Sequence, residues 1–322
     1  MIPRRHATAD KKGHTLPTGH RNIAAERWHW VSCSYSWSTS MECRSARLPF
    51  HSYANIFRVF FIWSDILRDN GRSNWTNQKP PMHLSIIIPA FNEERLIEEC
   101  LQSISTSLAA NHKPGFTSEI IVVDNNSTDN TANLARQAGA RVVFEPVNQI
   151  GRARNTGAAE ATGDWLLFVD ADSYLNTGLL ADILRLIEEG KSVGCGSTIQ
   201  MPGLPWWASA TLKLWTGTSV LFGWAAGALV VSRSDAFRDV GGFDQELYAA
   251  DEIGLSQKLR KWGQQRGLQF VILTKHPLES SPRKVQLYSA GEITGQILRV
   301  MLHPRRSLQD KKQLPVWYDG RR

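Results

Sequence analysis

The stretch Leu166-Leu167-Phe168-Val169-Asp170-Ala171-Asp172 decides the fold of this chain. Its apolar run is typical of a strand that is buried on both faces of a parallel sheet. The run ends at two aspartates, at the carboxyl end of the strand, where open α/β sheets bind their ligands. In extended backbone, side chains at positions i and i+2 point to the same side, so Asp170 and Asp172 can bind one hard metal ion beside phosphate oxygens. The alternative is a solvated turn or a helix N-cap, which Asp-X-Asp forms in many loops.

Strands and helices alternate on both sides of this stretch. From Met82 onward, apolar runs of strand length are followed by segments with apolar residues at helical spacing. This alternation is typical of βαβ units and predicts a mostly parallel sheet with helices on both faces. We expect strands at 84–88, 120–123, 141–144, 165–169 and 193–199, and helices from a cap at Asn92 to Leu108, through Leu134 to Gly139, at 151–161 and at 177–189.

The first quarter of the chain differs from the rest in its charge. Residues 1–81 hold 12 Lys and Arg against 5 Asp and Glu, whereas the remaining residues hold 25 of each. A net positive charge by itself suggests nucleic acid or an anionic membrane as a partner. Here the excess lies entirely in residues 1–81, so it says nothing about the rest of the protein. We expect no nucleic-acid partner, and we expect residues 1–81 to be an upstream extension, disordered or not native to a core that starts at Met82. A genuine interaction arm is the alternative.

The cysteines point to a reducing compartment. Cys33, Cys43, Cys100 and Cys195 have neither the spacing of metal ligands nor that of a disulfide framework. Cys100 falls on the apolar face of an expected helix and Cys195 in an expected strand, so we expect buried, reduced thiols. A cytoplasmic setting follows as an expectation.

Five segments carry polar and glycine motifs in a fixed order along the chain. They are 85–94 (SIIIPAFNEE), 121–129 (IVVDNNSTD), 151–157 (GRARNTG), 164–172 (DWLLFVDAD) and 240–244 (VGGFD) with Asp251, Glu252 and Leu255. Together they resemble the family-2 inverting glycosyltransferases of the GT-A fold, over about 82–263. The resemblance implies a Rossmann-like, mostly parallel sheet with helices on both faces and a mixed acceptor-side half. It places this glycosyltransferase domain at 82–284, followed by a helix and basic tail at 285–322.

The resemblance assigns the donor site to the ends of the first two strands. It implies that Asp124 hydrogen-bonds the nucleotide base, typically uracil, and that Pro89, Phe91 and Glu93 line the base and ribose. An Asx turn that caps the next helix is the alternative for Asp124. The alternative for Phe91 is that it only packs in the hydrophobic core.

The same resemblance assigns the diphosphate and the metal. Arg154 falls in a segment that is placed near the nucleotide, and a guanidinium matches the geometry of a diphosphate. Its alternative is a surface ion pair with Glu160 or Asp164. Asp170 and Asp172 become the Asp-X-Asp motif, which binds Mg2+ or Mn2+ because oxygen ligands favour these ions over zinc.

A carboxylate pair after the Gly-Gly-Phe-Asp turn supplies the general base in this family. The chain has Asp251-Glu252 there, where many members read Glu-Asp. Register favours Glu252 as the base, and Asp251 is the second candidate, with helix N-cap as its other role. Gly241 and Gly242 predict a tight turn before this pair. Arg283, in Ser280-Ser281-Pro282-Arg283-Lys284, resembles an element that clamps the diphosphate, and a solvated charge run is the alternative.

Two further segments concern the acceptor. The apolar stretch 206–231 is expected to build the acceptor pocket, with Trp206 and Trp207 available to stack on a sugar or to touch a lipid-linked acceptor at a membrane surface. A buried core hairpin or helix is the alternative. A short helix is expected at 293–301, and the basic residues of the tail either touch anionic lipid at the inner face of the membrane or are solvated. These basic residues are Arg305, Arg306, Lys311 and Lys312.

The sequence thus predicts a metal-dependent enzyme of the hexosyltransferase type, which moves a sugar from a nucleoside-diphosphate donor, UDP-linked by the resemblance, to an acceptor hydroxyl with inversion. The acceptor is a saccharide or a lipid-linked saccharide. One alternative is a degenerate module that binds glycans or partners without turnover. The other is a sugar nucleotidyltransferase, against which the absence of a Gly-rich phosphate loop after the first strand argues.

Overall fold

The computed structural model describes residues 82–225 and 227–318. The chain divides into two compact units, and all described residues belong to the second unit, Trp75–Arg322. The expectation about residues 1–81 lies outside the described residues.

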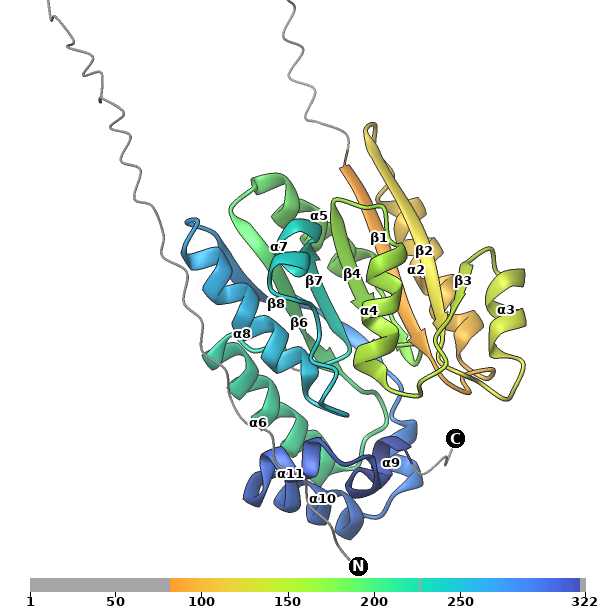
Figure 1. The fold of residues 1–322 in the computed structure, drawn as a ribbon, viewed down its shortest axis with the longest axis vertical. Coiled ribbons are helices and arrows are strands. Elements are labelled where there is room, and N and C mark those ends of the chain that lie inside the picture. The colour runs from red at the N-terminus through yellow and green to blue at the C-terminus, as the bar shows by residue number, and fades with distance from the viewer. Residues whose placement is uncertain (1–81, 226, 319–322) are drawn as a thin grey trace, which may run out of the picture. The chain divides into compact units, whose positions relative to one another are not determined.

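Eight strands in the described part form one mixed sheet in the order β3-β2-β1-β4-β7-β6-β8-β5 (Figure 1). Strands β1 to β4 are mutually parallel, as predicted, and β7 runs antiparallel to β4 and β6. On the far side β6 and β8 are parallel, and β5 pairs antiparallel with β8. The predicted parallel half with a mixed second half is therefore confirmed. The strands are β1 (Met82–Ala90), β2 (Phe116–Asp124), β3 (Arg141–Phe144), β4 (Trp165–Val169), β5 (Ser173–Tyr174), β6 (Ser192–Gln200), β7 (Leu229–Arg233) and β8 (Gln269–Ser280).

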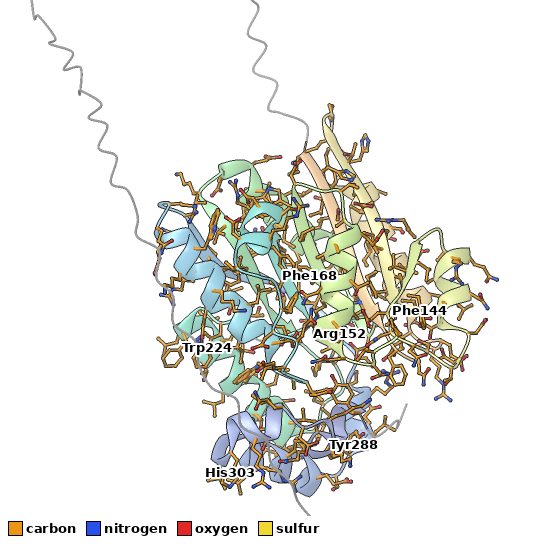
Figure 2. All side chains as sticks on the ribbon, viewed as in Figure 1. Phe144, Arg152, Phe168, Trp224, Tyr288 and His303 are labelled. Carbon is orange, nitrogen blue, oxygen red and sulfur yellow. The ribbon has the colours of Figure 1, made fainter. Side chains whose placement is uncertain are left out.

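Helices cover both faces of this sheet. Alternation along β1 sends Leu84, Ile86 and Ile88 into the core beneath α2 and α5. The opposite face packs beneath α4, α7 and α8 through residues such as Phe168, which lies at the centre of the view in Figure 2, whereas Phe144 lies at the outer edge on β3. The helices are α2 (Ile97–Ala110), α3 (Thr131–Gln137), α4 (Ile150–Glu160), α5 (Thr177–Glu189), α6 (Trp206–Phe222), α7 (Ser234–Asp239), α8 (Asp251–Gln264), α9 (Arg283–Leu287), α10 (Ala290–Leu302), α11 (Pro304–Leu308), the 3-10 helix η1 (Lys311–Gln313) and α12 (Pro315–Tyr318).

The predicted cap at Asn92 is wrong. Helix α2 begins at Ile97, and Glu98 and Glu99 occupy its first turn. Asn92 instead adopts the left-handed conformation, with φ of 53°, and its side-chain oxygen accepts a hydrogen bond from the backbone N–H of Thr128 at 2.8 Å. The Asn92 side chain therefore links the β1–α2 loop to the β2–α3 loop. Both loops lie at the same end of the sheet.

The apolar stretch after 206 forms a helix with large side chains in solvent. In α6, Trp206, Leu214 and Leu221 are 83%, 75% and 78% exposed, so the alternative of a buried core segment is wrong for this helix. The end of the same stretch, 229–231, does lie in the core, in strand β7. In the described residues, no helix combines the length and the hydropathy that crossing a membrane requires. The expected helix at 293–301 is present as α10.

Candidate active site

The carboxyl ends of β1, β2 and β4 meet at one end of the sheet. The parallel register pairs Ala90 with Asp124, and β4 ends directly before Asp170. Figure 1 shows that the C-terminal helices α9 to α11 lie at this end of the sheet. A cleft opens here, and it is lined by Pro89, Ala90, Phe91, Glu93, Asn125, Asn148, Ile150, Asp170, Ala171, Asp172 and Tyr318.

The two aspartates that the sequence singles out both line this cleft. The backbone N–H of Asp170 donates to the carbonyl of Ala228 at 3.1 Å, and that of Ser173 donates to the carbonyl of Asp170 at 3.1 Å, which makes a tight turn after β4. Asp172 is buried, and the hydroxyl of Ser173 lies 3.5 Å from its carboxylate. Among the described residues no group of three or more His, Cys, Asp or Glu side chains is placed to hold a metal. Two carboxylates fit Mg2+ or Mn2+ that takes its remaining ligands from phosphate and water.

Helix α4 lies close to the sheet because it carries small residues on its inner face. A Cβ at Gly157 would lie 2.4 Å from a methyl carbon of Ile87 and 2.8 Å from one of Val123, so a larger residue has no room. The preceding turn of α4 carries Arg154, whose side chain is almost fully buried. The close packing of α4 thus places a guanidinium beside the strand ends.

Arg154 bridges two parts of the site. Its Nη2 donates to Oδ1 of Asp170 at 2.7 Å. Its Nη1 donates to Oε1 of Glu252 at 2.9 Å and to Oδ2 of Asp251 at 3.2 Å. The guanidinium also lies 5.1 Å from the ring centroid of Phe243. The alternative for Arg154, a surface ion pair with Glu160 or Asp164, is therefore wrong, because the guanidinium is buried and pairs with other acids.

Electrostatics keep Arg154 charged. Burial alone would lower the pKa of its guanidinium, but Glu252, Asp170 and Asp251 outweigh burial and hold this pKa well above its ordinary value. Its Nε, although buried, has no hydrogen-bond partner in the structure. The cation is thus shared between the cleft and the acid pair of α8, and its expected contact with a diphosphate stays a prediction.

The acid pair starts helix α8. Asp251 and Glu252 follow Ala250, which adopts the left-handed conformation with φ of 61° and makes no side-chain cap, so the N-cap role considered for Asp251 is wrong. Gly241 and Gly242 have φ of 78° and 65°, which confirms the predicted tight turn upstream. The Asp251 side chain is 1% exposed and that of Glu252 is 15% exposed, so the second acid of the pair is the more accessible.

Asp251 holds its proton more tightly than an ordinary aspartic acid. Burial, followed by the charge of Glu252, raises its pKa to about 8, against the opposing effect of Arg154. Its Oδ1 has no hydrogen-bond partner. A pKa of about 8 leaves the carboxyl of Asp251 mostly protonated at neutral pH.

Asp124 and its neighbour Asn125 shape the loops beside the cleft. Oδ1 of Asp124 accepts from the backbone N–H of Ser127, three residues further on, at 3.0 Å. An Asx turn joins residues two apart, so Asp124 does not make the Asx turn that was its alternative. It does not cap α3, which begins after Asn130. The amide of Asn125 donates to the carbonyl of Val147 at 2.6 Å, and its oxygen accepts from Gln149 N–H at 2.9 Å. Sequence reasoning missed Asn125, whose only signal was its position directly after the strand-terminal aspartate.

The rim of the cleft is closed by an ion pair across a long sequence distance. Nη2 of Arg283 lies 2.8 and 2.7 Å from the two carboxylate oxygens of Glu93, which is buried. This pair joins α9 to the β1–α2 loop, beside Pro89 and Phe91 in the cleft wall. Arg283 is therefore a paired residue at the rim, and the solvated charge run considered as its alternative is wrong. Tyr318 of α12 also lines the cleft, and sequence reasoning missed it because no motif surrounds it.

Residues 85–220 match the family model described as "Glycosyl transferase family 2". We refer to these matched residues, which make up less than half of the chain, as the family-2 segment. The family-2 segment covers the cleft residues of β1, β2 and β4 and the helix that carries Arg154, but not the acid pair of α8 or the C-terminal helices.

Curated relatives are similar to this chain over about a third of its length. An uncharacterized glycosyltransferase of Mycobacterium tuberculosis is 32% identical over 123 residues, which are 38% of this chain and 52% of that protein. The poly(ribitol-phosphate) beta-N-acetylglucosaminyltransferase TarS of Staphylococcus aureus is 34% identical over 118 residues, which are 34% of this chain and 20% of TarS. The chain thus spans about half the length, or less, of these curated relatives.

The fold is that of the GT-A glycosyltransferases. The solved structure of the mannosyltransferase PcManGT from Pyrobaculum calidifontis, in complex with GDP-Man and Mn2+, superposes with a TM-score of 0.51 at 18% identity and covers 84% of this chain and 74% of that one. The predicted fold class is thereby confirmed.

Proposed function

We propose that this family-2 protein transfers a sugar from a nucleoside-diphosphate sugar to an acceptor hydroxyl, with inversion at the anomeric carbon. One observation carries the proposal: a single buried cation, Arg154, joins a carboxylate of the cleft, Asp170, to the acid pair of α8. Asp170, the proposed donor-binding acid, and Glu252, the proposed proton acceptor, thus contact the same side chain, that of Arg154. The relatives named as glycosyltransferases support the same reaction class.

The donor is proposed to occupy the cleft at the strand ends. In this proposal Asp170 and Asp172 hold Mg2+ or Mn2+ against the diphosphate, and the ion supplies charge neutralisation for the leaving group. Pro89, Phe91 and Glu93 border the nucleoside, and the proposed base is uracil, for which Asp124 is the expected hydrogen-bond partner. Arg283 is proposed to turn from Glu93 toward the diphosphate when the donor is bound.

Glu252 is proposed as the general base. The acceptor oxygen attacks the anomeric carbon from the face opposite the diphosphate, its proton passes to the carboxylate of Glu252, and the bond from that carbon to the diphosphate oxygen breaks. Glu252 is the more accessible of the two acids, and Arg154 fixes its orientation at 2.9 Å. Asp251 keeps its proton and therefore contributes no negative charge to the pair at neutral pH.

The acceptor is proposed to be a saccharide or a lipid-linked saccharide, with the protein at the inner face of a membrane. The exposed apolar side chains of α6 support this placement, because Trp206, Leu214 and Leu221 lie in solvent and Lys213 is the helix's only charge. An aromatic and aliphatic surface beside a basic residue is typical of an interfacial helix. Co-sedimentation with anionic phospholipid vesicles should fall when Leu214 and Leu221 are replaced by serine, and unchanged sedimentation would contradict the proposal.

Release of the nucleoside diphosphate tests the proposed activity. The full chain is incubated with each common nucleotide sugar and Mn2+, and the released nucleoside diphosphate is measured with and without a chelator. We expect release with at least one donor, dependent on metal, and its loss in Asp172→Asn. Nucleotide binding without release from any donor, with or without simple saccharide acceptors, would contradict turnover and favour the degenerate binding module.

A further inference from the structure

We infer that Tyr318 is part of the donor site and that its ring contacts the bound nucleoside diphosphate. The inference rests on the proposed function and extends the site beyond the family-2 segment. Every other residue that lines the cleft lies between Pro89 and Asp172, whereas Tyr318 comes from α12 near the end of the chain. The cleft is therefore complete only when the C-terminal helices are in place.

Several contacts fix the Tyr318 side chain. Its hydroxyl donates to the backbone carbonyl of Tyr248 at 2.8 Å, and its ring packs edge-on against the ring of Tyr248 at 5.6 Å between centroids. Nζ of Lys311 also lies 5.1 Å from the centroid of the Tyr318 ring. Because the hydroxyl already has a partner, the ring is the part of Tyr318 that remains to face a ligand. Aromatic rings bind bases and sugars by stacking, and they need no further polar partner to do so.

Further hydrogen bonds hold the C-terminal segment (residues 288–318) in this position. The backbone N–H of Tyr248 donates to the carbonyl of Leu308 at 2.7 Å, and Nζ of Lys311 donates to Oδ1 of Asn148 at 3.4 Å. Within the segment, the hydroxyl of Tyr288, labelled in Figure 2, donates to the carbonyl of Pro315 at 3.1 Å. The side chain of Leu314 is fully buried.

This segment touches both sides of the proposed reaction. Asn148 belongs to the loop before α4 and lines the cleft, whereas Tyr248 belongs to the loop that leads into Asp251 and Glu252. Through Tyr318 and Lys311, the end of the chain therefore spans the donor cleft and the loop that carries the acid pair. A wall contributed by a remote segment in this way determines which ligands fit, because pocket specificity depends on shape and on the groups that line it.

Nucleotide binding by matched tyrosine variants tests the inference. Binding of UDP and, in parallel, of GDP to the full chain is measured by calorimetry in the presence of Mn2+. Tyr318→Ala should bind the preferred nucleotide roughly 5- to 100-fold more weakly, the range that loss of one aromatic stacking contact gives. Tyr318→Phe keeps the ring and loses a hydrogen bond to the protein but no contact with the ligand, so its affinity should stay within about threefold of the unmodified protein, the small end of what a neutral hydrogen bond contributes. Tyr288→Phe loses an equivalent hydroxyl in the same segment, outside the cleft, and its affinity should stay within the range of Tyr318→Phe, well above that of Tyr318→Ala.

The outcomes separate this inference from the proposed function. If the unmodified protein binds neither nucleotide, the proposed function fails and the inference with it. If it binds, and a folded Tyr318→Ala variant binds equally well, only the inference is overturned. Should Tyr318→Ala not fold, hydrogen exchange of the unmodified protein decides: UDP with Mn2+ should slow amide exchange in 311–318, and unchanged exchange there would overturn the inference.

Discussion

The guanidinium of Arg154 donates to the carboxylate of Asp170 at 2.7 Å, and the same guanidinium donates to Asp251 at 3.2 Å and to Glu252 at 2.9 Å. One buried cation therefore stands among three acids that come from β4 and α8. The strand-terminal aspartate that the sequence assigns to a metal is thus electrostatically linked to the acid pair assigned to proton transfer. A change in the charge of Asp170 should therefore alter the electrostatic environment of Asp251 and Glu252, and the reverse.

Removal of the Arg154 charge should destabilise the protein strongly. In Arg154→Gln three acids face one another without a cation, and breaking a buried ion pair costs about 3–5 kcal/mol. Urea unfolding at neutral pH measures this free energy. Arg233→Gln is the control, because Arg233 pairs with Asp235 and the two side chains are 38% and 53% exposed, and such surface pairs contribute about 0–1 kcal/mol. Equal losses in the two variants would contradict a structural role for the buried cation.

The two acids of α8 should respond differently to amide substitution. Glu252→Gln removes the proposed base and should lower turnover by about 10²- to 10⁴-fold, the contribution of general base catalysis, while nucleotide binding survives. Asp251→Asn replaces a carboxyl that is already protonated at neutral pH and should retain most of the activity. Steady-state kinetics at pH 7 with calorimetric nucleotide binding separates them. If Asp251→Asn is the inactive variant, the assignment of the two roles is reversed.

Stability should fall with rising pH because of Asp251. The pKa of this carboxyl is raised from 3.8 to about 8 by burial and by Glu252, so between these values the folded protein binds a proton that the unfolded chain has lost. The stabilisation is fully present below pH 3.8 and is lost as pH rises through 8. Denaturant unfolding from pH 5 to 9 should show this decline in the unmodified protein and a smaller one in Asp251→Asn. Parallel profiles for the two proteins would exclude a raised pKa at this position.

Glu119 should act in the opposite direction at acid pH. Burial alone would raise its pKa, but hydrogen bonds from Ser85 and Thr162 and the charge of Arg141 outweigh burial and lower it to about 2. The resulting stabilisation is present above pH 4.5 and is lost as pH falls toward 2. Glu119→Gln should therefore be less stable than the unmodified protein at pH 7, with a difference that shrinks at low pH. A difference that is independent of pH would contradict the lowered pKa.

The parallel half of the fold was predictable because its strands are buried on both faces. The predicted strand at 165–169 matches β4, and the apolar runs at 84–88 and 120–123 lie inside β1 and β2. Both strands are longer than predicted, and the order of the strands in the sheet was not predicted. The motif residues at the strand ends could be placed in one cleft for the same reason, since parallel strands end together. The start of α2 was not predictable, because the side chain of Asn92 accepts a hydrogen bond from a backbone N–H of another loop and does not cap its own helix.

The partners of Arg154 and the role of Tyr318 depended on contacts that sequence spacing does not contain. Arg154 meets Asp251 and Glu252 across almost a hundred positions, and its choice among acids is decided by the close approach of α4 to the sheet at Gly157. Tyr318 reaches the cleft through a chain of short helices whose packing no periodicity describes. Contacts of this kind join residues far apart in the sequence, and they could not be predicted from local sequence patterns.

Calorimetric titration of UDP into the full chain, with and without Mn2+, tests the central claim most directly, with Asp170→Asn and Asp172→Asn measured beside the unmodified protein. The account predicts that the unmodified protein binds UDP tightly only when Mn2+ is present and that both variants lose this metal-dependent gain while remaining folded. Binding of UDP that is equal with and without the ion, or unchanged in both variants, would contradict the assignment of these two aspartates to a metal that holds the diphosphate.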